Sequence, residues 1–199
     1  RWRVRRVLPR ADAVTVINDE LYRYFARELA VAPPRLHLVP NAVDDAYASL
    51  RRDPAARRAR GLDDAYVFAF VGRLVGAKDL PTLLQALAMA RGRSQRDLRL
   101  VVAGDGTERD RLRRLAHELG IDGAIVWLGA QPDGRAALAL ADAFAMSSVS
   151  EGVPMAMLEA MRAGLPCVAT DVGGIAAVLA DGCGQVVPPS DPSALAAAL

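Results

Sequence analysis

The sequence has little of several features that mark common classes of protein. It has two cysteines, Cys167 and Cys183, and neither forms a C-x-x-C pair or a Cys/His spacing typical of metal ligands. Each lies beside apolar residues, so we expect two buried, reduced thiols in a cytosolic protein. No apolar run approaches the roughly 20 residues that a membrane-spanning helix needs.

The sequence also lacks a strong charge imbalance. Lys plus Arg number 25 and Asp plus Glu number 23, a net charge of +2 that gives no indication of nucleic-acid binding. Two stretches are nevertheless basic, RWRVRR at the start and RRDPAARRAR at 51–60. Solvated surface or linker is one interpretation of both, and contact with an anionic membrane face or a phosphorylated ligand is the other.

The ends of the chain suggest its context. In a signal peptide an apolar segment follows the basic start, and this sequence has no such segment. We therefore expect a cytoplasmic protein. A peripheral position at the inner face of the membrane is the alternative. The chain begins without methionine, and it ends with DPSALAAAL, inside a helical pattern. These ends are typical of a fragment of a longer protein.

Strands and helices alternate from residue 66 to the end. YVFAFVG (66–72) and LRLVVAGDG (98–106) are continuous apolar runs, typical of strands buried on both faces. Helical spacing fills the intervals, as in 107–120, where Thr107 is the expected cap and Gly120 the expected stop. The pattern predicts an α/β fold, a Rossmann-like doubly wound domain with a mainly parallel sheet.

The first third of the chain is less regular. ADAVTVIN (11–18) predicts a short strand, followed by a helix capped by Asn18 or Asp19, and LHLV predicts another strand. Residues 45–64 are polar, basic and alanine-rich, with Pro54 and Gly61, so we expect a linker with at most one short helix.

Parallel sheets bind ligands at the carboxyl ends of their strands, so the residues after each strand are the candidates for a site. Gly72 directly follows a buried strand, and Arg73 and Lys78 come within six residues of it. Glycine permits close approach to the backbone, and two cations favour an anion such as phosphate, although ordinary surface residues would look the same. Neither a P-loop nor a dinucleotide-binding fingerprint is present, and the missing fingerprint argues against a nicotinamide enzyme.

The stretch SEGVPMAMLEA (150–160) carries two carboxylates eight positions apart, Glu151 and Glu159. An all-helical path would separate them by about 12 Å, too far to act together on one bond as in a glycosidase. Gly152 and Pro154 indicate where a loop becomes a helix, whose free N–H groups favour an anion. A nucleotide sugar has this layout of sugar, diphosphate and ribose. A capping acid and an exposed helix residue are the alternative interpretation.

These motifs resemble those of the retaining glycosyltransferases of family 4, glycosyl transferases group 1, which have the GT-B fold. Residues 150–174 resemble that family's E-x7-E region, residues 71–87 its G-R-L-x-x-x-K loop and helix, and residues 101–121 its G-x-G-x-x-x-x-L segment. VPNAVD (39–44) is similar to the P-N-G-V-D crossover turn, with Ala42 in place of glycine. Asp79 stands where glycine usually follows the lysine.

The resemblance implies that residues 1–44 are the end of an N-terminal acceptor domain with the crossover, 45–64 the linker, and 65–199 a truncated C-terminal domain that binds the nucleotide sugar. It implies a hexosyltransferase-type enzyme of glycan biosynthesis, inactive as this isolated fragment, that transfers sugar from a nucleotide-diphosphate sugar to an acceptor hydroxyl. Its partners would be a UDP- or GDP-sugar and the missing N-terminal domain, without nucleic acid, and neither a metal nor a cofactor would be needed.

The resemblance also implies roles for individual residues. Arg73 and Lys78 would bind the diphosphate, Glu159 the ribose hydroxyls, and Glu151 would lie by the donor sugar, with Arg73, Lys78 and Glu151 as the catalytic set. The implied donor-binding residues are Gly72, Arg73, Lys78, Glu151, Gly152, Val153, Pro154, Met155 and Glu159. Two alternatives remain open: a non-catalytic module that binds nucleotide sugars, and a sugar phosphorylase or synthase on the same fold.

Overall fold

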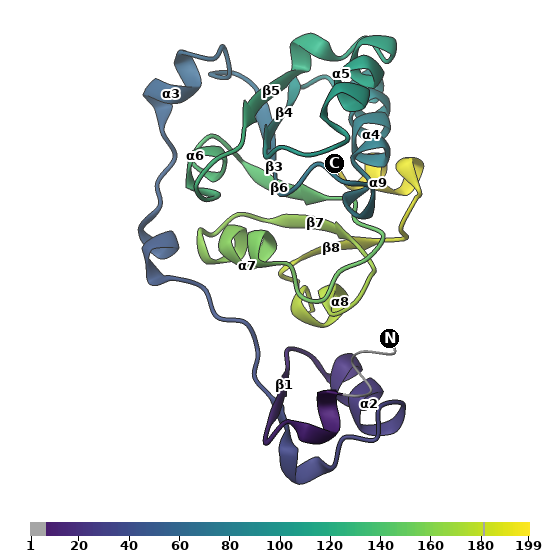
Figure 1. Ribbon diagram of the computed structural model, residues 1–199. Coiled ribbons are helices and arrows are strands. Elements are labelled where there is room, and N and C mark those ends of the chain that lie inside the picture. The colour runs from purple at the N-terminus through teal and green to yellow at the C-terminus, as the bar shows by residue number, and fades with distance from the viewer. Residues whose placement is uncertain (1–6, 181) are drawn as a thin grey trace. The chain divides into compact units, whose positions relative to one another are not determined.

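The computed structural model describes residues 7–180 and 182–199, and the chain divides into two compact units, Arg1–Ala42 and Val43–Leu199. The described part of the first unit contains two parallel strands, one α-helix and two 3-10 helices (Figure 1). Its elements are η1 (Leu8–Arg10), β1 (Val14–Val16), α2 (Asp19–Arg27), η2 (Pro33–Arg35) and β2 (Leu36–Leu38).

Helix α2 begins where the sequence predicts. The side chain of Asn18, rather than that of Asp19, caps it by accepting a hydrogen bond from the amide of Leu21 at 2.8 Å. Asp19 and Glu20 occupy the first turn, where negative charge interacts favourably with the helix dipole.

The second unit contains a six-stranded parallel sheet, which confirms the predicted α/β fold class. Its strands lie in the order β5-β4-β3-β6-β7-β8, so the chain runs outward from β3 in one direction and then from β6 in the other. Adjacent β3 and β6 therefore form the point at which the winding reverses. The strands are β3 (Tyr66–Val71), β4 (Leu98–Ala103), β5 (Ile125–Gly129), β6 (Ala143–Met146), β7 (Cys167–Thr170) and β8 (Gly184–Val187).

Helices cover both faces of this sheet (Figure 1). Strand β3 shows why its sequence is apolar throughout: Phe68 and Phe70 pack with α4, α5 and α9, and Val67 and Ala69 pack with α6, α7 and α8. The α-helices of the unit are α3 (Pro54–Arg58), α4 (Leu80–Arg93), α5 (Arg109–Glu118), α6 (Arg135–Leu138), α7 (Met155–Arg162), α8 (Ile175–Val178) and α9 (Pro192–Ala198). The 3-10 helices are η3 (Asp45–Ser49), η4 (Gly76–Lys78) and η5 (Asp122–Ala124).

The expected cap of α5 is wrong. The helix begins at Arg109 instead of directly after Thr107, and Glu108 is its N-cap, without a side-chain hydrogen bond. The amide of Glu108 donates instead to the carbonyl of Leu74, at 3.0 Å, so a contact with the neighbouring loop delays the start of the helix. Gly120 does end it, with φ of +66°.

Residues 45–64 are not the linker that composition suggests, because they pack onto the second unit. Arg57 is only 2% exposed, and its guanidinium donates to the carbonyls of Leu62, Ala65 and Leu140 at 2.6–2.7 Å and to Asp142 at 3.1 Å. Composition could not reveal this, because a buried arginine and a solvated one have the same sequence signature. The segment is therefore part of the folded second unit.

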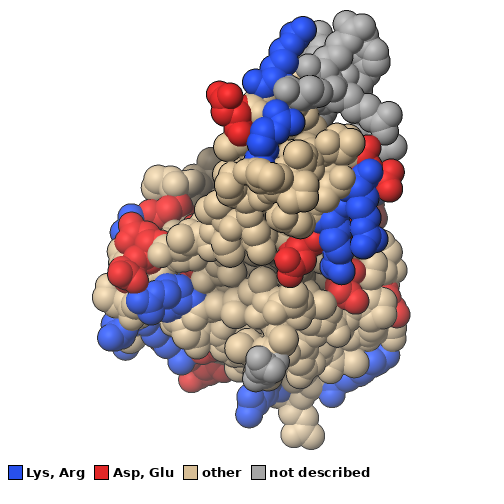
Figure 2. All heavy atoms as spheres, turned by 90° about the horizontal axis from the view of Figure 1, so that it is seen from below, with Lys and Arg blue, Asp and Glu red and all other residues tan. Residues whose placement is uncertain are grey.

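Two further expectations concern cysteine and charge. Cys167 is buried and unpaired, but Cys183, expected to be buried, is exposed beside β8. Acidic and basic side chains lie beside one another among a larger uncharged area on the face drawn in Figure 2. Within the described residues, no helix has both the length and the apolar character needed to cross a bilayer.

Candidate functional site

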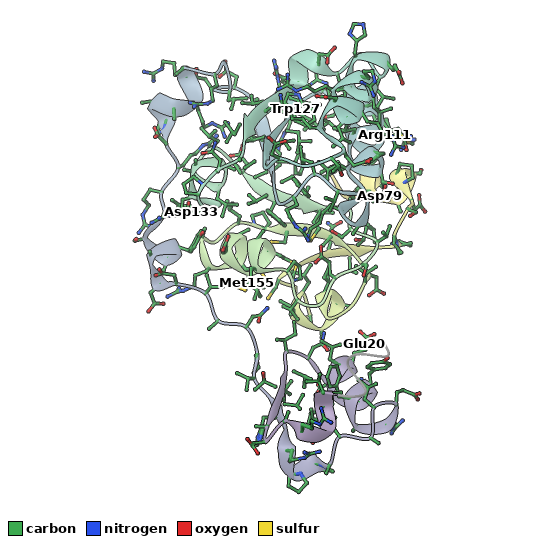
Figure 3. All side chains as sticks on the ribbon, viewed as in Figure 1. Glu20, Asp79, Arg111, Trp127, Asp133 and Met155 are labelled. Atoms are coloured by element: carbon green, nitrogen blue, oxygen red, sulfur yellow. The ribbon has the colours of Figure 1, made fainter. Side chains whose placement is uncertain are left out.

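A pocket of about 670 Å³ opens at the carboxyl ends of β3, β4 and β5, beside the loop that follows β6 and the start of α7. It therefore lies at the point where the winding of the sheet reverses, the usual ligand position in such folds. Two lining residues are marked in Figure 3: Asp133, before α6, and Met155, in the first turn of α7. The lining residues are Val71, Gly72, Arg73, Lys78, Ala103, Gly104, Asp105, Ala130, Gln131, Pro132, Asp133, Gly134, Glu151, Val153, Pro154, Met155, Ala156 and Glu159.

The loop from β3 to α4 brings both predicted cations to the pocket. Arg73 is exposed, and its side chain makes no hydrogen bond or ion pair with the described residues, so its charge is available to a ligand. Lys78 is the only lysine in the sequence and ends the 3-10 helix η4. Asp79 then adopts a left-handed conformation, φ 44° and ψ 46°, which explains why glycine would be favoured at this position.

Glycines let this loop and the next one pack backbone to backbone. A Cβ atom on Gly104 would lie 1.8 Å from the carbonyl oxygen of Gly72, and one on Gly106 would lie 2.3 Å from that of Leu74. Neither position can carry a side chain without moving a loop. The strand-end glycines thus set the shape of the pocket floor.

Lys78 and Glu151 form an ion pair across the pocket. The ammonium nitrogen lies 2.5 Å from Oε1 of Glu151, and the two side chains are 20% and 10% exposed. The hydroxyl of Ser148 donates to the same oxygen at 2.6 Å. Partial burial strengthens such charge-assisted bonds, so these three side chains are held in a defined arrangement.

The predicted transition from loop to helix occurs at Pro154, the N-cap of α7, which provides no side-chain hydrogen bond to the first turn. The amides of Met155 and Ala156 precede the first intrahelical hydrogen bonds and belong to residues that line the pocket. Gly152 does not line the pocket, unlike the other predicted donor-binding residues. Its carbonyl accepts from the amide of Gly174 at 2.7 Å and ties down the loop.

Glu159 faces the pocket from the second turn of α7. Burial raises the pKa of its carboxyl group because desolvation disfavours the charged form; hydrogen bonding to Tyr47 opposes this shift, and the charge of Asp133 adds to it. Burial, and then the charge of Glu159, likewise raise the pKa of the Tyr47 hydroxyl. Tyr47 belongs to η3, in the segment interpreted as linker, so no sequence pattern predicts its position beside Glu159.

The loop after β5 is a part of the site that sequence reasoning missed. Gln131, Pro132 and Asp133 line the pocket, and their position directly after a predicted strand was the available signal. Hydrogen bonds from Arg135 lower the pKa of Asp133 and hold the carboxylate ionised. Asp105 is likewise paired, with Arg109 at 3.3 Å. These two acids therefore carry arginine partners, which reduces their repulsion of an anionic ligand.

Among the predicted donor-binding residues, Gly72, Arg73, Lys78, Glu151, Val153, Pro154, Met155 and Glu159 all line this single pocket. In the comparison with known proteins, the sequence model of the family described as glycosyl transferases group 1 matches residues 53–199. The chain belongs to the glycosyl transferases group 1. The matched region takes in the entire lining of the pocket.

The chain is also similar in sequence to curated bacterial proteins. The chain is 31% identical over 198 residues to an exopolysaccharide phosphotransferase of Streptomyces coelicolor, covering 96% of this chain and 19% of the relative. It is 40% identical over 154 residues to the D-inositol 3-phosphate glycosyltransferase of Corynebacterium urealyticum, covering 72% of this chain and 36% of the relative. The chain thus spans only part of each of these two relatives.

Solved structures of other proteins share the fold. HepE of Anabaena, in complex with UDP-glucose, superposes with a TM-score of 0.82 at 23% identity, covering 94% of this chain and 52% of HepE. Sucrose-phosphate synthase from Thermosynechococcus elongatus gives a TM-score of 0.83 at 25% identity, covering 98% of this chain and 49% of the synthase. The chain therefore spans about half the length of each of these two proteins.

Proposed function

We propose that this chain is the donor-binding part of a retaining, metal-independent glycosyltransferase of family 4. The complete enzyme would transfer a sugar from a nucleotide-diphosphate sugar to an acceptor hydroxyl. The observation that carries this proposal is that Arg73, Lys78, Glu151 and Glu159, selected from the sequence for parts of one ligand, line one pocket. HepE, solved with UDP and with UDP-glucose, supports a nucleotide sugar as the ligand.

Each part of the donor has a matching group. Arg73, exposed and unpaired among the described residues, would bind the diphosphate together with Lys78 and the first-turn amides of α7. Glu159 would accept hydrogen bonds from the ribose hydroxyls. Glu151 would lie beside the sugar, close to Lys78, which can donate to the diphosphate as well because its ammonium has three protons.

Catalysis in this proposal is electrostatic. When the bond from sugar to diphosphate breaks, negative charge grows on the leaving phosphate, and the two cations and the helix N-terminus stabilise it. Arg73 and Lys78 take the place that a divalent cation holds in metal-dependent sites. Within the described residues, no three His, Cys, Asp or Glu side chains gather closely enough to hold a metal ion.

Binding of nucleotides to this chain tests the proposal. Calorimetry and thermal shift with UDP, GDP and ADP, each with EDTA and with Mg²⁺, should give saturable binding of one nucleotide that does not depend on the metal. Because the pocket is complete within the second unit, we expect binding without turnover. No binding by any nucleotide would refute the proposal, and turnover by this chain alone would refute its description as an inactive part.

Turnover by the complete enzyme tests the assigned residues. Lys78→Ala and Glu159→Ala should each slow turnover at least ~10-fold, about 1.4 kcal/mol of transition-state stabilisation. The steady-state rate with the natural donor is the measurement, and Glu118→Ala, on the exposed face of α5, is a matched control. Near wild-type rates in both site variants would show that the assignment is wrong.

A further inference from the structure

Three hydroxyl side chains are completely buried at the ends of β6 and β7. Ser147, Ser148 and Thr170 are each 0% exposed. A buried hydroxyl is costly unless it forms a hydrogen bond, and each of these three has a partner. Ser147 and Ser148 contact Lys78 and Glu151, which line the pocket, and Thr170 contacts Ser148, so these hydroxyls link the sheet to the pocket.

Ser148 acts on the carboxylate of Glu151. Its hydroxyl donates to Oε1 at 2.6 Å, and the ammonium of Lys78 approaches the same oxygen at 2.5 Å. The other oxygen, Oε2, accepts no hydrogen bond from the part of the chain that the structure describes. Two donors on one oxygen fix the carboxylate plane and leave the second oxygen for a ligand.

Ser148 is itself firmly placed. The hydroxyl of Thr170, the last residue of β7, donates to the Ser148 carbonyl at 2.5 Å. The next amide, that of Val149, donates to the carbonyl of Ala77 at 3.0 Å. The Ser148 hydroxyl is therefore a fixed donor attached to the end of the sheet, unlike the long side chain of Lys78, which can swing toward a ligand.

We propose that Ser148 is a positioning residue that orients Glu151, so that Oε2 is presented to the sugar of the donor while Lys78 turns to the diphosphate. This inference rests on the proposed function, which places Glu151 at the sugar. When Lys78 shares its protons with the diphosphate, the Ser148 hydroxyl keeps Oε1 in place. Ser148 thus affects recognition of the sugar and not of the nucleotide.

Ser147 provides a matched comparison. It is as buried as Ser148 and adjacent to it, but its hydroxyl donates to the backbone carbonyls of Asp79 and Lys78, at 2.8 and 3.1 Å. Its loss should disturb the placement of Lys78 and so weaken binding of the free nucleotide and of the nucleotide sugar alike. The two serines are expected to differ in which end of the donor they support.

The experiment measures dissociation constants for UDP and UDP-glucose, and for GDP and GDP-mannose, by calorimetry on the wild-type chain and on Ser148→Ala and Ser147→Ala. Ser148→Ala should weaken binding of the nucleotide sugar about tenfold more than binding of the matching free nucleotide. Loss of a hydrogen bond to a charged group has an effect of this size. Ser147→Ala should leave that ratio unchanged. An unchanged ratio in Ser148→Ala would overturn the proposal.

A measurement without ligand separates this inference from the proposed function. Because Lys78 is the only lysine, a ¹⁵N-labelled chain gives a single side-chain ammonium signal. In Ser148→Ala the less oriented Glu151 should hold that ammonium less firmly, and its exchange with water should accelerate. Unchanged exchange would also overturn the inference. If the wild-type chain bound neither these pairs nor ADP, the proposed function would fail, and the ammonium signal would still decide whether Ser148 orients Glu151.

Discussion

Among single residues, Glu159 holds a negative charge where the surroundings disfavour it. Burial raises the pKa of this carboxyl group, so between its unfolded and folded pKa values the native state binds more protons than the unfolded state. The free energy of unfolding therefore falls as the pH rises through that window, and it stays lower at neutral pH. Stability and ligand binding place opposite demands on this position.

We expect Glu159→Gln to raise the melting temperature at pH 7, because the amide has no charge to desolvate. The difference from wild type should shrink as the pH falls from the raised native-state pKa to the ordinary glutamate pKa of about 4.3, below which both side chains are neutral. Thermal unfolding across this pH range is the measurement, and exposed Glu118→Gln is the control. A lower melting temperature for Glu159→Gln at pH 7 would contradict the prediction.

The two thiols should react very differently. Burial raises the pKa of Cys167 to about 12, so almost none of its reactive thiolate exists near pH 8, whereas Cys183 is exposed. Iodoacetamide at pH 8 should modify Cys183 first and reach Cys167 only on unfolding. Mass spectrometry of the modified peptides is the measurement. Rapid modification of folded Cys183→Ser would show that Cys167 is accessible.

At the scale of single residues, the sequence predicts the side chains that directly follow a strand, but it does not predict those that reach the site from distant segments. Arg73 and Lys78 follow a recognisable strand, and the structure places both at the pocket. Tyr47 and Ser148 act through contacts with Glu159 and Glu151 that local spacing does not describe. The same limit explains Arg57, whose partners lie up to 85 positions away.

At the scale of elements, two glycines of the second unit illustrate opposite constraints. Gly104 follows β4, and a Cβ there would lie 1.8 Å from the Gly72 carbonyl oxygen, whereas Gly92, near the end of α4, has no atom within 4 Å of that position. A backbone carbonyl cannot move aside as a flexible side chain can. The first glycine is required by packing, and the second is not.

We therefore expect Gly104→Ala to lower the melting temperature and to abolish nucleotide binding, since one of the two loops must shift. Gly92→Ala should instead stabilise the protein by about 0.5–1 kcal/mol, because alanine favours the helix. Urea unfolding and calorimetry with the bound nucleotide compare the two variants. Equal effects would mean that the loops are not packed as described.

Elements were predicted best where a hydrophobic pattern is long. Strands β3 and β4 lie within the predicted apolar runs, and helix α4 fills the interval between them over Leu80–Arg93. The prediction was poorest where contacts between loops determine where an element begins, as at the start of α5. Helix α6 is also shorter than its alanine-rich sequence suggests, ending at Leu138 because Asp142 is drawn into hydrogen bonds with β3 and Arg57.

At the scale of the whole molecule, the second unit contains the complete pocket and begins before the sheet does. The segment from Val43 to the start of β3 contributes Tyr47 and Leu62 to the core and Arg57 to a buried set of hydrogen bonds. Stability should therefore depend on this segment and not on the first unit.

A chain shortened to residues 43–199 should keep the melting temperature of this unit and its affinity for the nucleotide. A chain shortened to residues 65–199 should be strongly destabilised, because it loses buried apolar side chains and leaves the Leu140 carbonyl without its arginine donor. Circular dichroism and calorimetry would distinguish the two. Equal stability would restore the interpretation of 45–64 as a linker.

The anchoring of Arg57 also bears on how the two units are connected. If Arg57 were not anchored, about twenty residues would form a flexible linker between the two units, and each unit could move almost independently of the other. Because η3 and α3 are held against the rest of the second unit, the boundary between the two units lies at Ala42 and Val43. Any movement of one unit relative to the other would then require changes in only a few backbone torsion angles at this boundary, and a single proline substituted there could prevent it.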